Sequence, residues 1–280
     1  MTAYFRPRSL EEAIAIRAAR DVAVIAGGTD IYPAHTARRA WGEPTHKDVL
    51  DITAIPGLRI IEATAAGWRI GCLVTWSALA ATPLPPLFDG LKRAAREVGG
   101  RQVQNRATII GNLCTASPAG DGIPNLLALD ASVELAGPQG RRVVPLHDFL
   151  IGYRATALRA EEIVTALIVP RLDGARGSFE KLGARRYLVI SIAMAAGVVA
   201  TDAAGRITTA RVAVGACSAV AERLPALEAA LLGVALAEAP QVPLPAHLAG
   251  LSPIDDVRAS ATYRREAALT LLRDMLRGLA

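Results

Sequence analysis

The chain has 280 residues, of which 52% are hydrophobic and 20% charged, a composition that excludes a disordered chain and allows one large domain or two modest ones. The net charge is +5, but the arginines are scattered, often beside acids, and only 4% of the residues are aromatic, which argues against a nucleic-acid-binding protein. Three dispersed cysteines argue against a structural metal site, and the lack of a long apolar run or leader predicts a cytoplasmic protein with no transmembrane segment.

Short helices and strands alternate along the first 170 residues. Ser9 and the acids that follow it predict the start of a helix over residues 9–20. Further on, prolines interrupt predicted helical turns over residues 76–99. Apolar runs bounded by glycine or polar residues predict buried strands, and these runs are residues 21–26, 48–53, 58–64, 67–75, 107–110, 132–137, 141–146 and 161–170.

The character of the sequence changes after residues 170–177, a candidate linker that contains a proline, two glycines and several charges. Residues 189–217 predict two long antiparallel strands that turn at 202–205. Residues 222–236 and 262–280 predict amphipathic helices. The sequence therefore predicts an α+β protein with a larger N-terminal domain and a smaller domain of sheet and helices.

A first glycine loop follows the predicted strand at residues 21–26. Gly27 and Gly28 permit backbone angles and close contacts that other residues do not. Successive N–H groups in such a turn can bind phosphate oxygens, and Thr29 adds a hydroxyl. The loop is neither a GxGxxG nor a P-loop motif, so the Rossmann and Walker interpretations fail. A tight turn without a ligand is the alternative.

A second loop contains small and hydroxyl-bearing residues over positions 111–122. Gly111 and Asn112 follow a predicted strand, and Thr115, Ser117 and Asp121 add hydroxyl and carboxylate groups. A dinucleotide needs donors for its pyrophosphate and acceptors for its ribose or adenine, and the two loops together can supply both. An Ω-like surface loop is the alternative, although long loops of this kind are usually functional.

The two loops, in this order and spacing, resemble the motifs of the FAD-binding (medium) subunit of molybdenum hydroxylases, the family of xanthine dehydrogenase and carbon monoxide dehydrogenase. The family motif AGG-[TH]-[DS]-L stands here as AGGTDI, residues 26–31. The motif T-[IV]-GGN with A-x-P-x-x-D stands as TIIGNLCTASPAGD, residues 108–121. A K-x-x-x-R segment begins at Lys181, and SATYRR at residues 260–265 matches the start of the family's C-terminal helix. The resemblance spans the whole chain.

The resemblance implies a fold and a cofactor. Residues 1–173 would form a two-subdomain FAD-binding domain of the vanillyl-alcohol-oxidase-like (PCMH) type, and residues 177–280 a small C-terminal domain of the CO dehydrogenase flavoprotein type. The two loops would hold the pyrophosphate and ribityl chain, Asp121 would hydrogen-bond toward the adenosine, Val164 would offer a backbone contact and Lys181 would approach the flavin. The candidate FAD-binding residues are Ile25, Ala26, Gly27, Gly28, Thr29, Asp30, Ile31, Thr108, Ile109, Ile110, Gly111, Asn112, Ser117, Asp121, Val164 and Lys181.

Three features depart from the family pattern or leave a choice open. Ile110 stands where the family has a glycine, so its side chain either crowds the phosphate or points away. Tyr187 or Leu188 replaces an acidic pair and would lie over the isoalloxazine. The alternative for Lys181 is an exposed charge at a strand end. His35, His46, His147 and His247 are scattered and form no acid–base constellation.

The resemblance implies that the chain is an electron-transfer subunit. Electrons from substrate oxidation on a molybdenum-cofactor large subunit would pass through the clusters of a [2Fe–2S] small subunit to FAD on this chain and then to an external acceptor, in a dimer of heterotrimers. The first rival is a stand-alone flavin oxidoreductase of the same fold, which needs its own substrate base. The second is a flavin-free scaffold subunit, which Ile110 keeps open.

Overall fold

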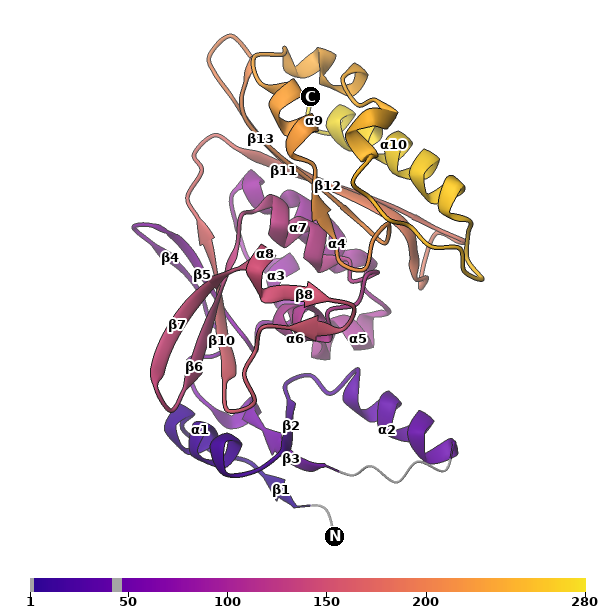
Figure 1. Ribbon diagram of the computed structural model, residues 1–280. Helices are drawn as coiled ribbons and strands as arrows, with labels where there is room; N and C mark the ends of the chain where they lie inside the picture. The colour runs from indigo at the N-terminus through magenta and orange to yellow at the C-terminus, as the bar shows by residue number, and fades with distance from the viewer. Residues whose placement is uncertain (1–2, 42–46) are drawn as a thin grey trace.

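The computed structural model describes residues 3–41 and 47–280. The described residues form three stacked layers, each built on a sheet, and the chain passes through them in order from the N-terminus to the C-terminus (Figure 1). Helices and strands are both abundant but do not alternate regularly, and the sheets of two of the three layers are antiparallel. The predicted α+β class is confirmed.

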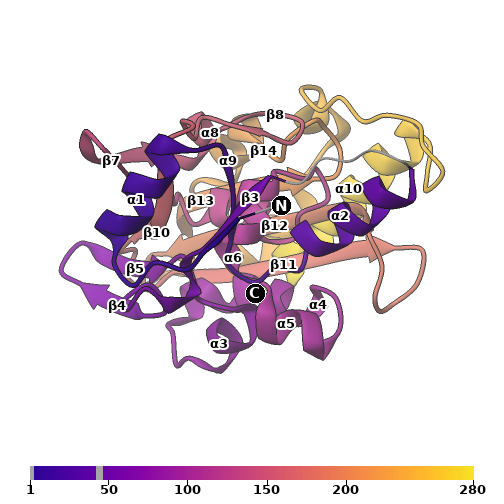
Figure 2. The same cartoon turned by 90° about the horizontal axis from the view of Figure 1, so that it is seen from below.

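The first layer is a small parallel sheet of β1 (Tyr4–Phe5), β3 (Asp48–Asp51) and β2 (Val22–Ile25), in the order β1-β3-β2. The helix predicted at residues 9–20 is α1 (Leu10–Ala19), and the Ser9 side chain caps it by accepting the Glu12 N–H at 3.1 Å. Helix α2 (Ile31–Ala40) extends from this layer (Figures 1 and 2). The sequence did not predict α2, because it carries a proline in its first turn and no buried apolar face.

The second layer is an antiparallel sheet in the order β4-β5-β10-β6-β7, covered by short helices. Its central strand β10 is the predicted apolar run at residues 161–170. The strands are β4 (Ile61–Thr64), β5 (Gly67–Gly71), β6 (Ser132–Gly137), β7 (Gly140–Pro145) and β10 (Ile163–Pro170). The helices are α3 (Trp76–Ala81), α4 (Asp89–Glu97), α5 (Arg101–Arg106), α6 (Ile109–Thr115), α7 (Gly122–Ala128) and α8 (Leu146–Phe149), with the short 3-10 helices η1 (Ile52–Ala54) and η2 (Pro86–Phe88). Strand β8 (Leu150–Gly152) pairs with β9 (Ala155–Thr156) in a separate hairpin.

The strand predicted at residues 107–110 is wrong. Only Thr108 makes an isolated bridge, to Thr75, and the chain then turns into α6. The Thr108 side chain caps this helix by accepting the Gly111 N–H at 3.0 Å, a bond that a strand residue could not make. Helices α6 and α7 also take up half of the second glycine loop, so only residues 116–121 are left as a connection.

The third layer is an antiparallel sheet in the order β11-β12-β13-β14. Its strand β12 (Ser191–Thr201) is buried on both faces: Ala193, Ala195 and Val199 face a core formed with α9 and α10, whereas Met194 and Val198 face the core shared with the second layer. This double burial explains why the strand shows no polar alternation. The remaining elements are β11 (Arg176–Gly183), β13 (Ile207–Gly215), β14 (Glu222–Arg223), α9 (Pro225–Leu231), α10 (Ala261–Arg277), η3 (Leu236–Gln241) and η4 (Pro245–Leu248).

Candidate FAD site

A cavity of about 680 Å³ lies between the first and second layers. Strand β2 and the first glycine loop line one side of it, and helix α6, the connection at 116–121 and the start of β10 line the other. Its volume lies within the range of about 300–1,000 Å³ that is usual for small-molecule and cofactor sites. The two glycine loops that the sequence singled out therefore face one common space.

The first wall is the turn from β2 into α2. Gly28 has a φ of +74°, a left-handed conformation that favours glycine. Within the described part of the chain, none of the backbone N–H groups from Gly27 to Asp30 has a hydrogen-bond acceptor in the protein. A run of unpaired N–H groups along a cavity wall is suited to an anionic ligand.

Gly27 brings this wall against the segment that leads into α6. A Cβ atom at Gly27 would overlap the carbonyl oxygen of Arg106 and would lie 2.9 Å from the Cα of Ala107. The two walls are also joined by a hydrogen bond from Thr115 Oγ1 to Asp30 Oδ2, at 3.3 Å. The absence of a side chain at residue 27 therefore sets the separation of the two walls.

The second wall contains Gly111, Asn112, Ser117 and Gly120. The side-chain oxygen of Asn112 is buried and has no hydrogen-bond partner among the described residues. An unpaired buried acceptor is unfavourable, so a turn of the Asn112 side chain that brought this oxygen to a ligand hydroxyl or amine in the cavity would be favoured.

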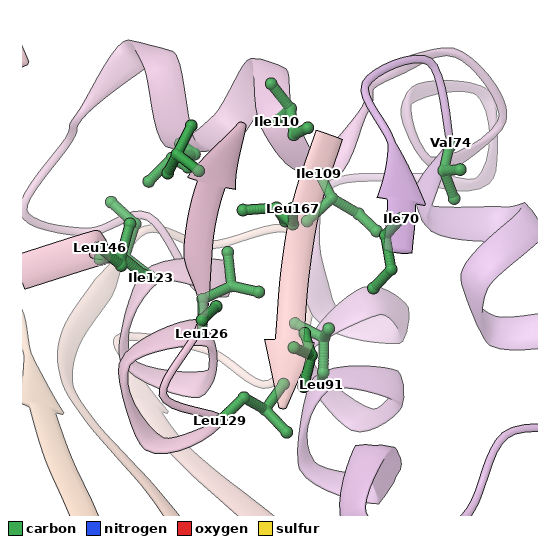
Figure 3. Packing of buried hydrophobic residues seen from close by; sticks show 14 of the residues in the cluster. Ile70, Val74, Leu91, Ile109, Ile110, Ile123, Leu126, Leu129, Leu146 and Leu167 are labelled. Carbon is green, nitrogen blue, oxygen red and sulfur yellow. The ribbon is translucent and has the colours of Figure 1, made fainter. Parts of the chain in front are cut away.

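Ile110 belongs to both the cavity lining and the core. Its side chain is only 4% exposed and lies in the hydrophobic cluster that joins the first two layers. Figure 3 shows Ile109 beside Ile70 and Leu167, with Ile110 next to it on α6. The isoleucine that replaces the family's glycine is therefore used in packing and also borders the cavity.

Of the sixteen candidate FAD-binding residues, twelve line the cavity and four do not. Ile25 and Ile109 are buried in the protein and do not line it. Asp121 and Lys181, which the resemblance places near the adenosine and the flavin, do not line it either. The twelve are Ala26, Gly27, Gly28, Thr29, Asp30, Ile31, Thr108, Ile110, Gly111, Asn112, Ser117 and Val164.

Asp121 and Lys181 instead bind each other. Lys181 Nζ lies 2.6 Å from Asp121 Oδ2, and Ser191 Oγ donates to Asp121 Oδ1 at 2.6 Å. Both charged side chains are less than a tenth exposed, so the alternative of an exposed lysine is wrong. Burial raises the pKa of the Asp121 carboxyl, and the bonds from Lys181 and Ser191 oppose that rise. The pair joins α7 to the third layer.

Two arginines that sequence reasoning missed line the same cavity. Arg17 of α1 donates to the carbonyl oxygens of Val22, at 2.5 Å, and Glu162, at 3.3 Å, and burial lowers the pKa of its guanidinium. Arg154 lies in the turn between β8 and β9. Neither arginine belongs to one of the two glycine motifs. Both lie in other parts of the chain, and only the fold brings them to the cavity.

The described residues contain no group of three or more His, Cys, Asp or Glu side chains that could hold a metal ion. His147 and His247 do not line the cavity, and His46 and the side chain of His35 lie outside the described residues. In the part of the chain that the structure describes, no helix is long and apolar enough to cross a membrane.

Comparison with known proteins defines the class. The family model "FAD binding domain in molybdopterin dehydrogenase" matches residues 1–172, and "CO dehydrogenase flavoprotein C-terminal domain" matches residues 178–279. The chain belongs to the FAD-binding medium subunits of the molybdenum hydroxylase family, of CO dehydrogenase and xanthine dehydrogenase type, which are subunits of multi-subunit oxidoreductases. The predicted family, the FAD-binding domain and the C-terminal domain type are confirmed.

The similarity extends over almost the whole length of the individual relatives. The nicotinate dehydrogenase FAD-subunit of Eubacterium barkeri is 34% identical over 273 residues, which are 94% of this chain and 91% of the relative. The nicotine 6-hydroxylase medium subunit of Paenarthrobacter nicotinovorans is 32% identical and covers 96% of this chain and 94% of its own. A chain of the solved carbon monoxide dehydrogenase from Hydrogenophaga pseudoflava has a TM-score of 0.89 at 28% identity, covering 99% of this chain and 96% of that one.

The residues of the cavity fit FAD. The unpaired N–H groups of the first loop suit a pyrophosphate, and the orphaned oxygen of Asn112 suits a hydroxyl. Gly27 keeps a side chain out of the contact between the two walls. The space, its donors and its acceptor are those that a dinucleotide requires.

Proposed function

We propose that the chain is the FAD-carrying electron-transfer subunit of a molybdenum-dependent hydroxylase or dehydrogenase, which takes electrons from the [2Fe–2S] clusters of a partner subunit and passes them to an external acceptor. The observation that carries this proposal is the joining of both glycine loops on one cavity between two subdomains. FAD bound there would collect electrons one at a time from the clusters, which carry single electrons, and would pass them on in pairs or singly. The chain contributes the binding, the orientation and the exclusion of water.

The ionisable groups of the cavity favour electron transfer over substrate chemistry. Asp21 pairs with Lys47 at 2.8 Å, and Glu162 accepts two hydrogen bonds from Arg142, at 2.7 and 2.8 Å, which lower the pKa of its carboxyl. No histidine belongs to the cavity lining among the described residues. A stand-alone oxidoreductase needs a free base near the flavin. These two carboxylates are already engaged, and Asp30, the third carboxylate of the described lining, accepts the Thr115 hydroxyl at 3.3 Å.

We further propose that the partners are a molybdenum-cofactor large subunit and a [2Fe–2S] small subunit, in a dimer of heterotrimers located in the cytoplasm. Several relatives are named as medium chains or subunits, which supports a larger and a smaller partner. Large apolar side chains are exposed on both halves of the chain, including Ile151, Tyr153 and Val257. Such side chains suit burial against other subunits.

The relatives bear names with different substrates, among them nicotinate, nicotine and carbon monoxide. Similar flavin subunits thus occur with different substrate chemistries. We therefore propose that the substrate of the complex is selected on the large subunit.

The test begins with the purified chain, whose visible spectrum should show a flavin double band and whose acid extract should release FAD at about one per chain. Affinity purification of the tagged chain from its own host should then bring molybdenum and iron with it in fixed proportion. A chain that stays colourless after incubation with FAD would support a scaffold. A flavin-loaded chain that oxidises a substrate without any partner would support a stand-alone enzyme.

A further inference from the structure

The hairpin of β8 and β9 places one arginine at the cavity. Arg154 occupies its turn with a φ of +50°, which side-chain-bearing residues rarely adopt. The Arg154 N–H donates to the carbonyl oxygen of Ala116, the residue that ends α6, at 3.1 Å. This bond fixes the backbone of Arg154 directly beside the connection at 116–121, and Arg154 is one of the residues that line the cavity.

A charge count of the cavity leaves Arg154 available. Among the described lining residues, Lys47 is neutralised by Asp21, and Glu162 by Arg142. Asp30 has no cationic partner among them and accepts the Thr115 hydroxyl at 3.3 Å. Arg17 is charged, but two of its nitrogens are already engaged with backbone carbonyls. The Arg154 guanidinium, in contrast, has no hydrogen-bond acceptor or carboxylate within residues 3–41 and 47–280, and only the ring of Tyr153 lies near it, 6.0 Å from its central carbon.

The pyrophosphate of a dinucleotide needs this charge. Two negative charges must be compensated, and the backbone N–H groups of the first glycine loop carry none. An arginine presents a planar array of donors that matches phosphate oxygens and gives charge-assisted bonds. We propose that Arg154 binds the pyrophosphate of FAD from the side opposite the first glycine loop; this inference rests on the proposed function. Arg154 stands outside both glycine motifs, so it is a separate third contribution to the site.

The full chain, stripped of flavin, tests this by fluorescence titration with FAD and with riboflavin, which has the same ring but no phosphate. We expect Arg154→Met to weaken FAD binding by about tenfold to a hundredfold, the usual range for a lost charge-assisted bond. Riboflavin binding should stay unchanged, and Arg154→Lys should recover part of the loss. Arg159→Met is the control, because Arg159 is also an exposed arginine of the same segment but does not line the cavity.

The salt dependence of FAD binding provides a second readout. The affinity of the unaltered chain should fall with increasing salt more steeply than that of Arg154→Met, because one charge contact is missing in the variant. Equal FAD affinity and equal salt dependence in the two proteins would overturn the inference. A parallel loss of riboflavin affinity would also overturn it, since it would indicate a packing role for the hairpin. Failure of the unaltered chain to bind FAD would instead overturn the proposed function itself.

Discussion

The substitution Gly27→Ala tests whether close contact of the two cavity walls creates the FAD site. The added Cβ would overlap the carbonyl oxygen of Arg106, lie 2.7 Å from its carbonyl carbon and lie 2.9 Å from the Cα of Ala107. All three atoms are backbone, so no side chain can rotate away and one wall must shift. Overpacking of this kind destabilises by about 1–3 kcal/mol.

For a chain of this size, such a loss should lower the melting temperature by about 2 to 12 °C. We also expect FAD affinity to fall at least about tenfold, which corresponds to about 1.4 kcal/mol, because the unpaired N–H groups move with the shifted wall. Gly250→Ala is the matched control: nothing lies within 4 Å of the Cβ that it would add. It should leave both quantities within about 0.5 kcal/mol of the unaltered chain.

Thermal unfolding and FAD titration of the two variants check this prediction. If Gly27→Ala unfolds and binds FAD as the Gly250→Ala control does, the walls are not set by the contact at residue 27. If stability falls while FAD affinity stays the same, the contact matters for the fold but does not position the donors of the first loop.

Three further substitutions follow from the structure. Lys181→Met should destabilise the chain by about 3–5 kcal/mol because it leaves the buried Asp121 carboxylate unpaired. Combining it with Asp121→Asn should recover much of that loss. Additive unfolding free energies in the double-mutant cycle would contradict this coupling. Ile110→Ala should cost about 2–5 kcal/mol in urea unfolding but change the FAD dissociation constant less than about threefold, and a large gain in affinity would show that the side chain crowds the ligand. The bonds from the Arg258 backbone and from Arg264 hold the pKa of Asp256 at about 2. Asp256→Asn should therefore lower stability at neutral pH, and the difference from the unaltered chain should shrink as pH falls from about 4 through 2. A difference that stays constant over this range would refute the assignment.

The sign of the last effect follows from linkage. Asp256 binds its proton less readily in the folded chain than in the unfolded chain, so its bonds stabilise the fold only while the carboxyl is ionised in both states. That stabilisation is fully present above about pH 4, the pKa of an unfolded aspartate, and is lost as the folded carboxyl is protonated near pH 2.

The sequence by itself determined the features that depend on local chemistry. Ser9 with its following acids specified the start of α1, and the apolar run at residues 161–170 specified the buried central strand β10. The glycine pair at residues 27 and 28 identified a wall of the cavity, because glycine favours the left-handed angle found at residue 28 and alone allows the backbone contact found at residue 27. The family motifs identified the class of cofactor for the same reason, since they consist of residues that such local backbone conformations and contacts need.

Only the tertiary structure decided which distant groups share a space. Residues 109–115 form α6 and not the predicted strand, and Thr108 caps that helix. Ile110 packs in a core whose other members are mostly far away in the sequence. Lys181 forms an ion pair with Asp121, which is 60 residues away in the sequence, because a buried charge is stable only beside an opposite one. Arg154 lies at the cavity because its backbone N–H binds the carbonyl oxygen of Ala116, a contact that no local sequence pattern indicates. Burial and charge pairing depend on the whole fold, and no short stretch of sequence carries that information.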